Sequence, residues 1–261
     1  MIGRYLVVGI IVVSSLTVCI SACKKEPIKE DFRQPKIGDL GGMKVSIPWY
    51  MAELIEYEGD PGWDLDKWKT FKFPQRTFDS KITSFGFKIR FPDGAVPSTD
   101  ALLLDSIEQN KNIYKTMWMS VGINSGNIFY QNGLNDIAKH VQNPDLRSPF
   151  DNYERLLKNE YGLKVYALKG VNPMTNQPYR KDSNAKDIFL YQDKNKNIQT
   201  IISCYNYNSV HTVAPCEHRF TLLEKKINAE IYVIYRRDML INWREIELMV
   251  KQKIQTIEVS K

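Results

Sequence analysis

The sequence predicts an α+β fold that is mainly antiparallel β-sheet with a few helices, including an amphipathic helix at the C-terminal end. Two observations support this prediction. Apolar and polar side chains alternate in many short segments along the chain, which is the pattern of strands with one buried face. Helical periodicity occurs in only a few segments, which fall irregularly between the strands, whereas a parallel α/β fold would alternate strand and helix regularly.

The strands are predicted from this alternation. The clearest is Phe-Gly-Phe-Lys-Ile-Arg-Phe, residues 85–91, where aromatic or branched side chains alternate with glycine, lysine and arginine. Between residues 45 and 57 the apolar side chains fall on one parity, which predicts a pair of strands interrupted near Pro48. The polar segment 192–197 has the composition of a hairpin turn. Further strands are predicted at 117–123, 163–168, 187–192, 198–205, 218–223 and 229–235.

Helices are predicted at 101–109, 134–141, 152–161 and 243–254. The last is the most strongly predicted, because its apolar residues recur at helical spacing and Asn242 with Glu245 resembles a capping box. Thr99 or Asp100 is suited to cap the first helix.

The N-terminal segment has the pattern of a bacterial lipoprotein signal peptide over residues 1–22. A single cation, Arg4, precedes an unbroken apolar core of roughly ten residues, which is short of the roughly 20 that a membrane span needs. The run ends in Ile-Ser-Ala-Cys, residues 20–23, which resembles a lipobox. The alternative is an uncleaved membrane span in which Cys23 is incidental.

Proteins with a lipobox are cleaved before the cysteine, which is then acylated with fatty acids such as palmitate. By this resemblance Cys23 is the lipidated first residue of the mature chain, and two or three acyl chains hold a protein firmly to a membrane. The polar residues that follow predict a flexible tether over 23–40 and a globular region over 41–261, which could divide into two halves near 148–154. Lys24 in place of aspartate favours the outer membrane by similarity to enterobacterial sorting, which predicts a lipid-anchored protein on the periplasmic face of the envelope.

The formal net charge of +6 is modest and spread along the chain. No basic block of the kind that binds nucleic acid occurs, so no nucleic-acid partner is predicted. The sequence also contains no His-Glu-x-x-His motif and no glycine loop that could cradle a phosphate, and no cofactor is predicted. A Ser-x-x-Lys match at 183–186 has no companion motif, and four-residue matches of this kind are common by chance. We therefore expect a protein that is not an enzyme.

Two cysteines follow Cys23 in the chain, Cys204 and Cys216. Outside the cytoplasm an even pair predicts a disulfide, and a strand, a turn and a returning strand could bring the two residues within bonding range. The alternative is a zinc site that adds His211 and His218, although the Cys-x-His spacing is not that of a common zinc knuckle. The prediction is a disulfide, with no metal.

The acidic segment 56–68 is the best candidate for a functional site. Asp60, Asp64 and Asp66 lie in it beside Trp63 and Trp68. The carboxylates could hold calcium or act as acid and base, although the spacing does not fit an EF-hand loop and acid–base work needs a carboxylate with a raised pKa. A solvated loop is the simplest interpretation. Tryptophans among charges are also typical of partner recognition, which is the role predicted for these five residues.

Several short motifs spread over most of the mature chain together carry a family resemblance. They are Gly41-Gly42 with Val45-x-Ile47-Pro48, the stretch Glu56-Tyr57-Glu58-Gly59-Asp60-Pro61-Gly62, Arg76-Thr77-Phe78, Phe85-Gly86-Phe87 with Arg90-Phe91-Pro92-Asp93, Trp118-Met119-x-Val121-Gly122-Ile123-Asn124, Cys216-x-His218-x-Phe220 and Trp243-Arg244-x-Ile246. With these motifs the chain resembles a set of bacterial lipoproteins found with type VI secretion effectors.

This resemblance implies an immunity protein that sits in the periplasm and neutralises an injected toxin, in several cases a phospholipase. It implies no catalytic residues. A membrane-tethered domain without a catalytic set is consistent with a stoichiometric inhibitor, which needs a rigid scaffold and a complementary surface. The predicted partner is therefore a secreted effector, with a lipase as the first expectation. The alternatives are a general envelope lipoprotein with a scaffold or assembly role, and an envelope hydrolase that uses the acidic segment.

Overall fold

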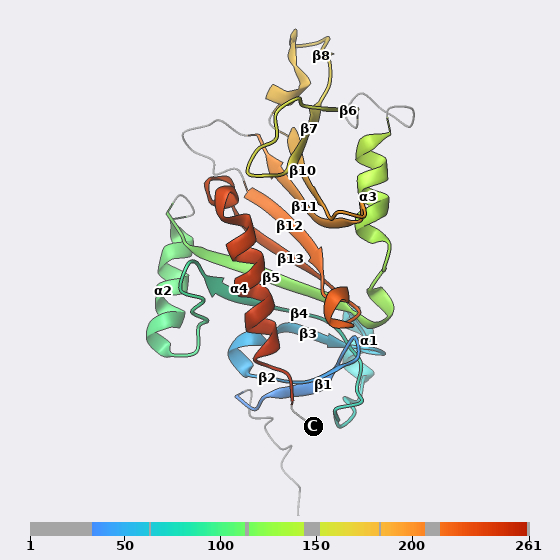
Figure 1. The fold of residues 1–261 in the computed structure, drawn as a ribbon. Coiled ribbons are helices and arrows are strands. Elements are labelled where there is room, and N and C mark those ends of the chain that lie inside the picture. The colour runs from blue at the N-terminus through green and yellow to red at the C-terminus, as the bar shows by residue number, and fades with distance from the viewer. Residues whose placement is uncertain are drawn as a thin grey trace, which may run out of the picture. The chain divides into compact units, whose positions relative to one another are not determined.

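A nine-stranded antiparallel sheet forms the centre of the fold (Figure 1). Its strands lie in the order β3 (Glu53–Tyr57), β4 (Ile82–Arg90), β5 (Trp118–Ser125), β13 (Ala229–Arg236), β12 (Pro215–Thr221), β11 (Ile198–Tyr205), β10 (Lys186–Gln192), β7 (Lys164–Leu168) and β6 (Tyr153–Arg155). The computed structural model describes residues 33–62, 64–112, 115–143, 152–182, 184–206 and 215–259. The predicted α+β class and the dominance of antiparallel sheet are confirmed.

Two small sheets and four α-helices complete the described part of the chain. The small sheets are β1 (Lys36–Leu40) with β2 (Met43–Ile47), and β8 (Val171–Asn172) with β9 (Gln177–Pro178). The helices are α1 (Leu65–Thr70), α2 (Asp100–Lys111), α3 (Gly133–Gln142) and α4 (Trp243–Gln255). Short 3-10 turns occur at η1 (Trp49–Met51), η2 (Gly126–Ile128), η4 (Tyr179–Lys181), η5 (Leu223–Lys225) and η6 (Arg237–Asn242).

One face of the large sheet carries the main core. Side chains alternate along a strand, and the register places Phe87, Val121, Val233 and His218 in one row across four strands. All four side chains are buried. Helix α4 covers this face (Figure 1). The ring of its Trp243 lies 6.1 Å from that of His218. The predicted C-terminal helix is confirmed, and its apolar side closes the core.

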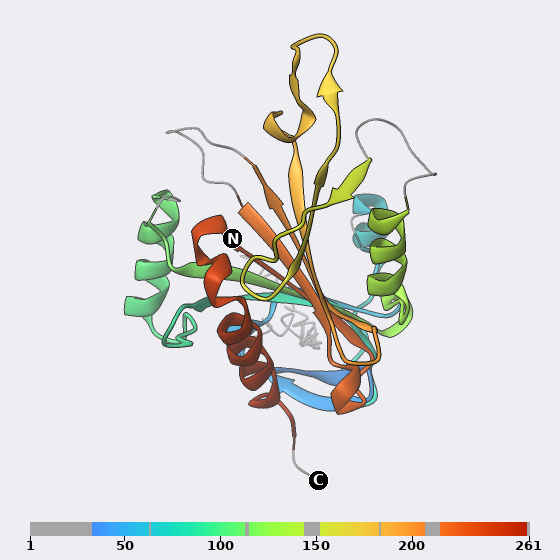
Figure 2. The same cartoon turned by 45° about the horizontal axis from the view of Figure 1, so that its top comes forward.

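Among the described residues, helices cover the opposite face of the sheet at its two ends. Helix α3 packs Leu134, Ala138 and Val141 over β10 and β11. Helix α2 covers a corner near the start of β5, where the indole N–H of Trp118 donates to the carboxylate of Asp105 at 3.0 Å. Figure 2 shows α2 (green) and α3 (yellow-green) at opposite ends of the sheet. The middle of this face lies between them.

Most of the predicted elements are present. The strands predicted at 85–91, 117–123, 163–168, 187–192, 198–205, 218–223 and 229–235 are confirmed as β4, β5, β7, β10, β11, β12 and β13. Three predicted helices are confirmed as α2, α3 and α4. Thr99 caps α2, since its hydroxyl accepts from the backbone N–H of Leu102 at 3.3 Å. Asn242 makes no such bond at the start of α4, so the capping box predicted there is wrong.

The two strands predicted between 45 and 57 with a break near Pro48 are confirmed as β2 and β3, and the turn η1 after Pro48 sends β2 to pair with β1 and β3 to pair with β4. One other local prediction is wrong. The helix predicted at 152–161 is the strand β6 followed by a turn. Pairing with β7 and burial of Tyr153 against two apolar clusters override the weak helical pattern there.

Two predicted boundaries also change. The tether was expected to reach Leu40, but Lys36–Leu40 form β1, since Leu40 is fully buried and the strand pairs with β2. The strands on either side of 148–154 share one sheet through the pairing of β13 with β5, and 33–261 is one compact unit instead of two halves. The leader, Cys23 and residues 23–32 lie outside the described residues.

The predicted disulfide between Cys204 and Cys216 is present. The two residues lie directly opposite each other on β11 and β12, with their Cα atoms 4.1 Å apart, and both are buried. Within the described part of the chain, no helix combines the length and the apolar character needed to cross a membrane.

Candidate partner-binding face

The uncovered middle of the large sheet is the first part of the candidate site. The register aligns two rows of outward side chains on β4, β5, β13 and β12, which we call the open face. One row is Gly86, Gly122, Tyr232 and Arg219, and the other is Lys88, Ser120, Ile234 and Glu217. Ser120 and Ile234 are exposed, although they lie on central strands. Ile234 beside the half-buried Tyr232 gives this face an apolar part, which makes it a candidate contact surface.

The floor of the open face is shaped by a glycine and a tyrosine. Gly122 lies opposite Tyr232, and a Cβ atom on Gly122 would come within 1.9 Å of the Cζ atom of the tyrosine ring. The phenol ring of Tyr232 therefore lies flat across the backbone of β5. Only glycine leaves room for this arrangement.

The substitution Gly122→Ala is expected to push the ring of Tyr232 off the sheet without unfolding the protein. The atoms that clash belong to the mobile end of the side chain, so the ring can move while the backbone stays. Ring-proton chemical shifts of Tyr232 should change. Gly133→Ala on α3 is the matched control, because its nearest neighbour atom lies at 3.7 Å. Unchanged Tyr232 resonances in Gly122→Ala would contradict the described packing.

Charges on the open face are largely compensated at one end. Arg219 lies between two carboxylates, forming ion pairs with Glu217 and, at 3.4 Å, with Glu230. Burial raises the pKa of Glu230, and the guanidinium opposes this. Lys88 has no ion pair within the described residues. The face therefore combines apolar and charged groups, as interface rims do.

An apolar pocket adjoins the open face at the edge strand β3. It has a volume of about 280 Å³ and is lined by Leu54, Ile55, Glu56, Gly62, Leu65 and Trp68, and we call it the edge pocket. Leu54 and Leu65 are 76% and 77% exposed, and Trp68 is half-exposed. The side chain of Glu56 lies 3.4 Å from the hydroxyl of Ser84 on β4, which joins the pocket to the open face.

The carboxylates predicted for partner binding have separate structural roles. Asp60 accepts from the backbone N–H of Tyr57 at 2.9 Å and pairs with Arg76, and both side chains of this pair are largely buried. Asp64 caps α1, and its bonds to the α1 backbone and to Lys67 lower its pKa.

Asp66 pairs with Lys69 in solvent. The structure does not bring the three aspartates together, and no group of three or more His, Cys, Asp or Glu that could hold a metal is found in the described ranges. The calcium hypothesis therefore finds no support there.

Of the two tryptophans predicted for partner binding, one can be placed in the structure. Trp63 lies outside the described residues. Trp68 forms a wall of the edge pocket, and its indole N–H donates to the carbonyl of Gly62 at 2.6 Å. Leu54 and the open face were missed by sequence analysis. Leu54 lies on the opposite parity from the apolar side chains of 45–57, so the alternation places it on the outer face, but the sequence does not show the bulge in β3 or the neighbouring Trp68. The pairing of Gly122 with Tyr232 likewise depends on the register of distant strands.

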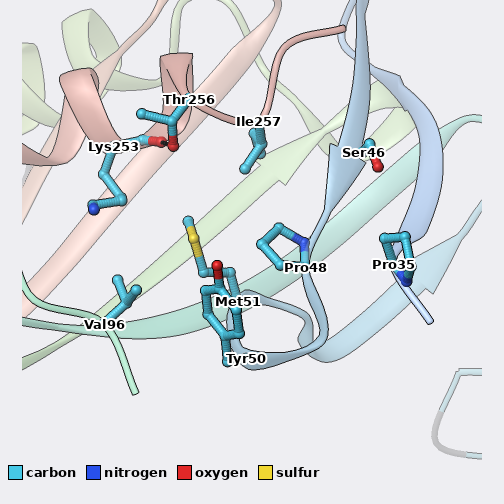
Figure 3. Close-up of a pocket in the computed structure, with 9 residues that line it drawn as sticks. All are labelled: Pro35, Ser46, Pro48, Tyr50, Met51, Val96, Lys253, Thr256 and Ile257. Carbon is cyan, nitrogen blue, oxygen red and sulfur yellow. Dashed lines mark hydrogen bonds between the residues drawn. The ribbon is translucent and has the colours of Figure 1, made fainter. Parts of the chain in front are cut away.

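A different pocket lies between β2, η1 and the end of α4 (Figure 3). It has a volume of about 350 Å³, and its lining includes Tyr50, Met51, Val96 and Ile257. Lys253 is the one charged residue among its lining residues. The other ionisable side chain of the lining drawn in Figure 3 is Tyr50, and no carboxylate, histidine or cysteine is among the lining residues. We therefore assign no chemistry to this pocket.

A buried polar cluster lies under α4. The carboxylate of Glu247 is within 3.2 Å of His218 Nε2, accepts from the hydroxyl of Thr200 at 2.8 Å and pairs with Lys251 at 2.9 Å. The hydroxyl of Tyr235 lies 3.2 Å from His218 Nδ1. Both ring nitrogens are thus occupied and the cysteines are joined in a disulfide. Cys204, Cys216 and His218 are therefore not free to bind zinc, and the zinc alternative is wrong for these three residues. Its fourth residue, His211, lies outside the described residues.

Together, these features describe a sheet with one face closed by a C-terminal helix and with the middle of the other face free of cover by the described residues. No protein-family model and no curated protein sequence matches the chain. Among solved structures, the chain is similar in fold to Smlt3025, an immunity protein of the Stenotrophomonas maltophilia type IV secretion system, with a TM-score of 0.51 and 14% identity over 87% of this chain and 94% of that one. It is also similar to the Neisseria meningitidis iron-regulated outer membrane lipoprotein FrpD, with a TM-score of 0.46 and 10% identity over 87% and 93% of the two chains.

Proposed function

We propose that this protein is an immunity lipoprotein that binds a secreted antibacterial effector and neutralises it. The observation that carries the proposal is the open face with its edge pocket, which exposes apolar side chains among charges on a rigid sheet. Smlt3025, a secretion-system immunity protein, has a similar fold and supports the same conclusion. Lipidation at Cys23 would hold the protein on the periplasmic face of the envelope, at the outer membrane.

The chemistry of the face suits inhibition by occlusion. A binding protein needs groups that are already ordered, since each side chain immobilised on binding reduces affinity. Here the sheet register orders Tyr232 and Ile234, and the ion pairs around Arg219 hold neighbouring side chains in place. A tightly bound partner would lose access to its own substrate without any reaction on the immunity protein.

The finer part of the proposal concerns the effector. The sequence motifs resemble lipoproteins found with type VI secretion effectors, and a lipase acting on the membrane is the effector we propose to test first. Smlt3025 belongs to a type IV secretion system, so effectors of that kind are tested beside it. The product of a toxin gene adjacent to the gene for this protein would be the first effector to test.

Deletion and challenge test the proposal. Cells that lack the gene should be killed by siblings that deliver the neighbouring effector, and the full-length protein should restore survival and bind the purified effector. If deletion cells survive every neighbouring effector and no binding is measured, the proposal fails. A growth or permeability defect without any competitor would instead indicate the general envelope scaffold role.

A further inference from the structure

We infer that the edge pocket binds an apolar side chain of a partner protein that is flanked by lysine or arginine. Under the proposed function, on which this inference rests, the partner is the effector. The inference adds the chemistry of the contacting segment, which the overall function does not specify.

The backbone at Leu54 provides the first argument. Leu54 has φ of +49°, a left-handed conformation that side-chain-bearing residues rarely adopt. Register shifts between Glu53 and Tyr57 show that β3 bulges here, and the side chain of Leu54 is three-quarters exposed. An exposed leucine gains no burial energy that would offset this unfavourable backbone conformation. Backbone outliers of this kind concentrate at functional sites.

The walls of the edge pocket are fixed in advance. The indole of Trp68 is held by its bond to the carbonyl of Gly62 and by the ring of Phe73, whose centroid lies 5.2 Å away. Leu65 opens the first turn of α1, which Asp64 caps. A closed cavity of about 150 Å³ already accepts benzene, so the edge pocket is large enough for a branched or aromatic side chain.

The charge around the edge pocket is negative on the sheet side. Within the described ranges, Glu53 and Glu56 on β3 have no ion pair, whereas Asp64 and Asp66 are each matched by a lysine of α1. Lys72 lines a separate pocket on the other side of α1. A lysine or arginine beside the bound apolar side chain would complement the two glutamates. An anionic lipid surface would be repelled by them.

Short peptides give the first test. The probe is a blocked peptide Gly-Arg-Leu-Lys-Gly, with Gly-Glu-Leu-Asp-Gly and Gly-Arg-Gly-Lys-Gly as controls. It is added to the full-length protein in phosphatidylcholine nanodiscs, with 5-fluorotryptophan as the label and Trp68→Phe to assign the resonance. The basic leucine peptide should shift the Trp68 signal, with an affinity about tenfold above that of either control. No shift, or an equal response to the acidic peptide, would overturn the inference.

Matched variants locate the contact. Leu54→Gly suits the left-handed backbone and removes only the pocket wall, and Glu53→Gln with Glu56→Gln removes only charge. Each change should lower the affinity for the basic leucine peptide about fivefold or more. The control Leu104→Ala is an exposed leucine on α2, and the control Glu154→Gln lies on the opposite edge strand β6, so neither should have an effect.

Two further outcomes separate the inference from the proposed function. If the wild-type protein protects cells and the Leu54 and Glu53/Glu56 variants protect equally at the same protein level, the inference is overturned and the proposed function stands. If the wild type protects against no effector, the proposed function fails. The peptide titration alone then decides whether the edge pocket binds a basic apolar segment. A homodimer in analytical ultracentrifugation that Leu54→Gly dissociates would show that a second copy fills the pocket, which would also overturn the inference.

Discussion

Replacing Asp187 with alanine is expected to lower the free energy of unfolding by about 3 kcal/mol. The Asp187 side chain is fully buried at the start of β10. Its two oxygens accept two bonds from Arg180, both at 2.9 Å, and one from Arg237 at 2.5 Å. Without the carboxylate, two guanidinium groups would be left side by side. Both retain some access to water, which places the expected loss at the low end for a broken buried ion pair.

The loss should be visible as a lower urea midpoint with an unchanged slope. Asp238→Ala is the control, because its pair with Arg236 lies next to Arg237 in sequence but Asp238 is mostly exposed, and surface pairs contribute about 0–1 kcal/mol. Asp187→Asn keeps the shape and should fall between the two. Equal midpoints for Asp187→Ala and Asp238→Ala would show that the buried cluster does not stabilise this end of the sheet.

Arg237 also donates to the carbonyls of Cys204 and Tyr205, so this cluster joins η4, β10, β11 and η6 beside the disulfide. Sequence analysis predicted the strands and the disulfide here but not the ion cluster. Strands with one face in the core leave an alternating pattern that the sequence itself contains. The ion cluster depends on which strands become neighbours in the sheet, and the local sequence pattern does not predict this pairing.

The same distinction explains the errors in the fold. Helix α1 was missed because it buries no side chain, so it has no apolar periodicity, and only the cap at Asp64 marks its start. Segment 152–161 was predicted as a helix because its local pattern was judged alone, whereas pairing with β7 decides its structure. Local patterns predicted elements well where burial and periodicity agree.

At the candidate site, tryptophans among charges drew attention to the acidic segment, and Trp68 of that segment lines the edge pocket. The aspartates around it make local contacts, with Asp60 paired to Arg76, Asp64 capping α1 and Asp66 paired to Lys69, and their role in partner binding stays a prediction. The motif Cys216-x-His218-x-Phe220 behind the family resemblance is also internal, since all three residues are buried in the core. These three motif residues therefore belong to the core, and the contact surface that we propose does not include them.

Lowering the pH from 7.5 to 5 is expected to reduce the free energy of unfolding through the protonation of His218 in the unfolded chain. Complete burial lowers the pKa of His218 below its usual value near 6.5, although Glu247 opposes the shift. The unfolded chain therefore takes up a proton below pH 6.5 that the folded protein does not. Stability is fully present above that value and is lost as the pH falls toward the folded pKa.

Glu247 affects the pH dependence of stability in a lower pH range than His218 does. Burial would raise its pKa, but the hydrogen bond from His218 and the ammonium of Lys251 outweigh burial and hold the pKa below its usual value near 4.5. Its contribution to stability is therefore lost only below about pH 4.5. Glu230, whose pKa is raised by burial, works in the opposite direction on acidification. Between pH 7.5 and 5 the main expected loss belongs to His218.

Urea titrations at several pH values separate these groups. His218→Gln can still donate to Glu247 and accept from Tyr235, so it should fold with a reduced midpoint that depends much less on pH in this range. His140→Gln on the exposed side of α3 should keep the wild-type pH dependence. If His218→Gln retains the full loss between pH 7.5 and 5, the titrating group lies elsewhere. The buried histidine would then stabilise α4 on the sheet only by packing.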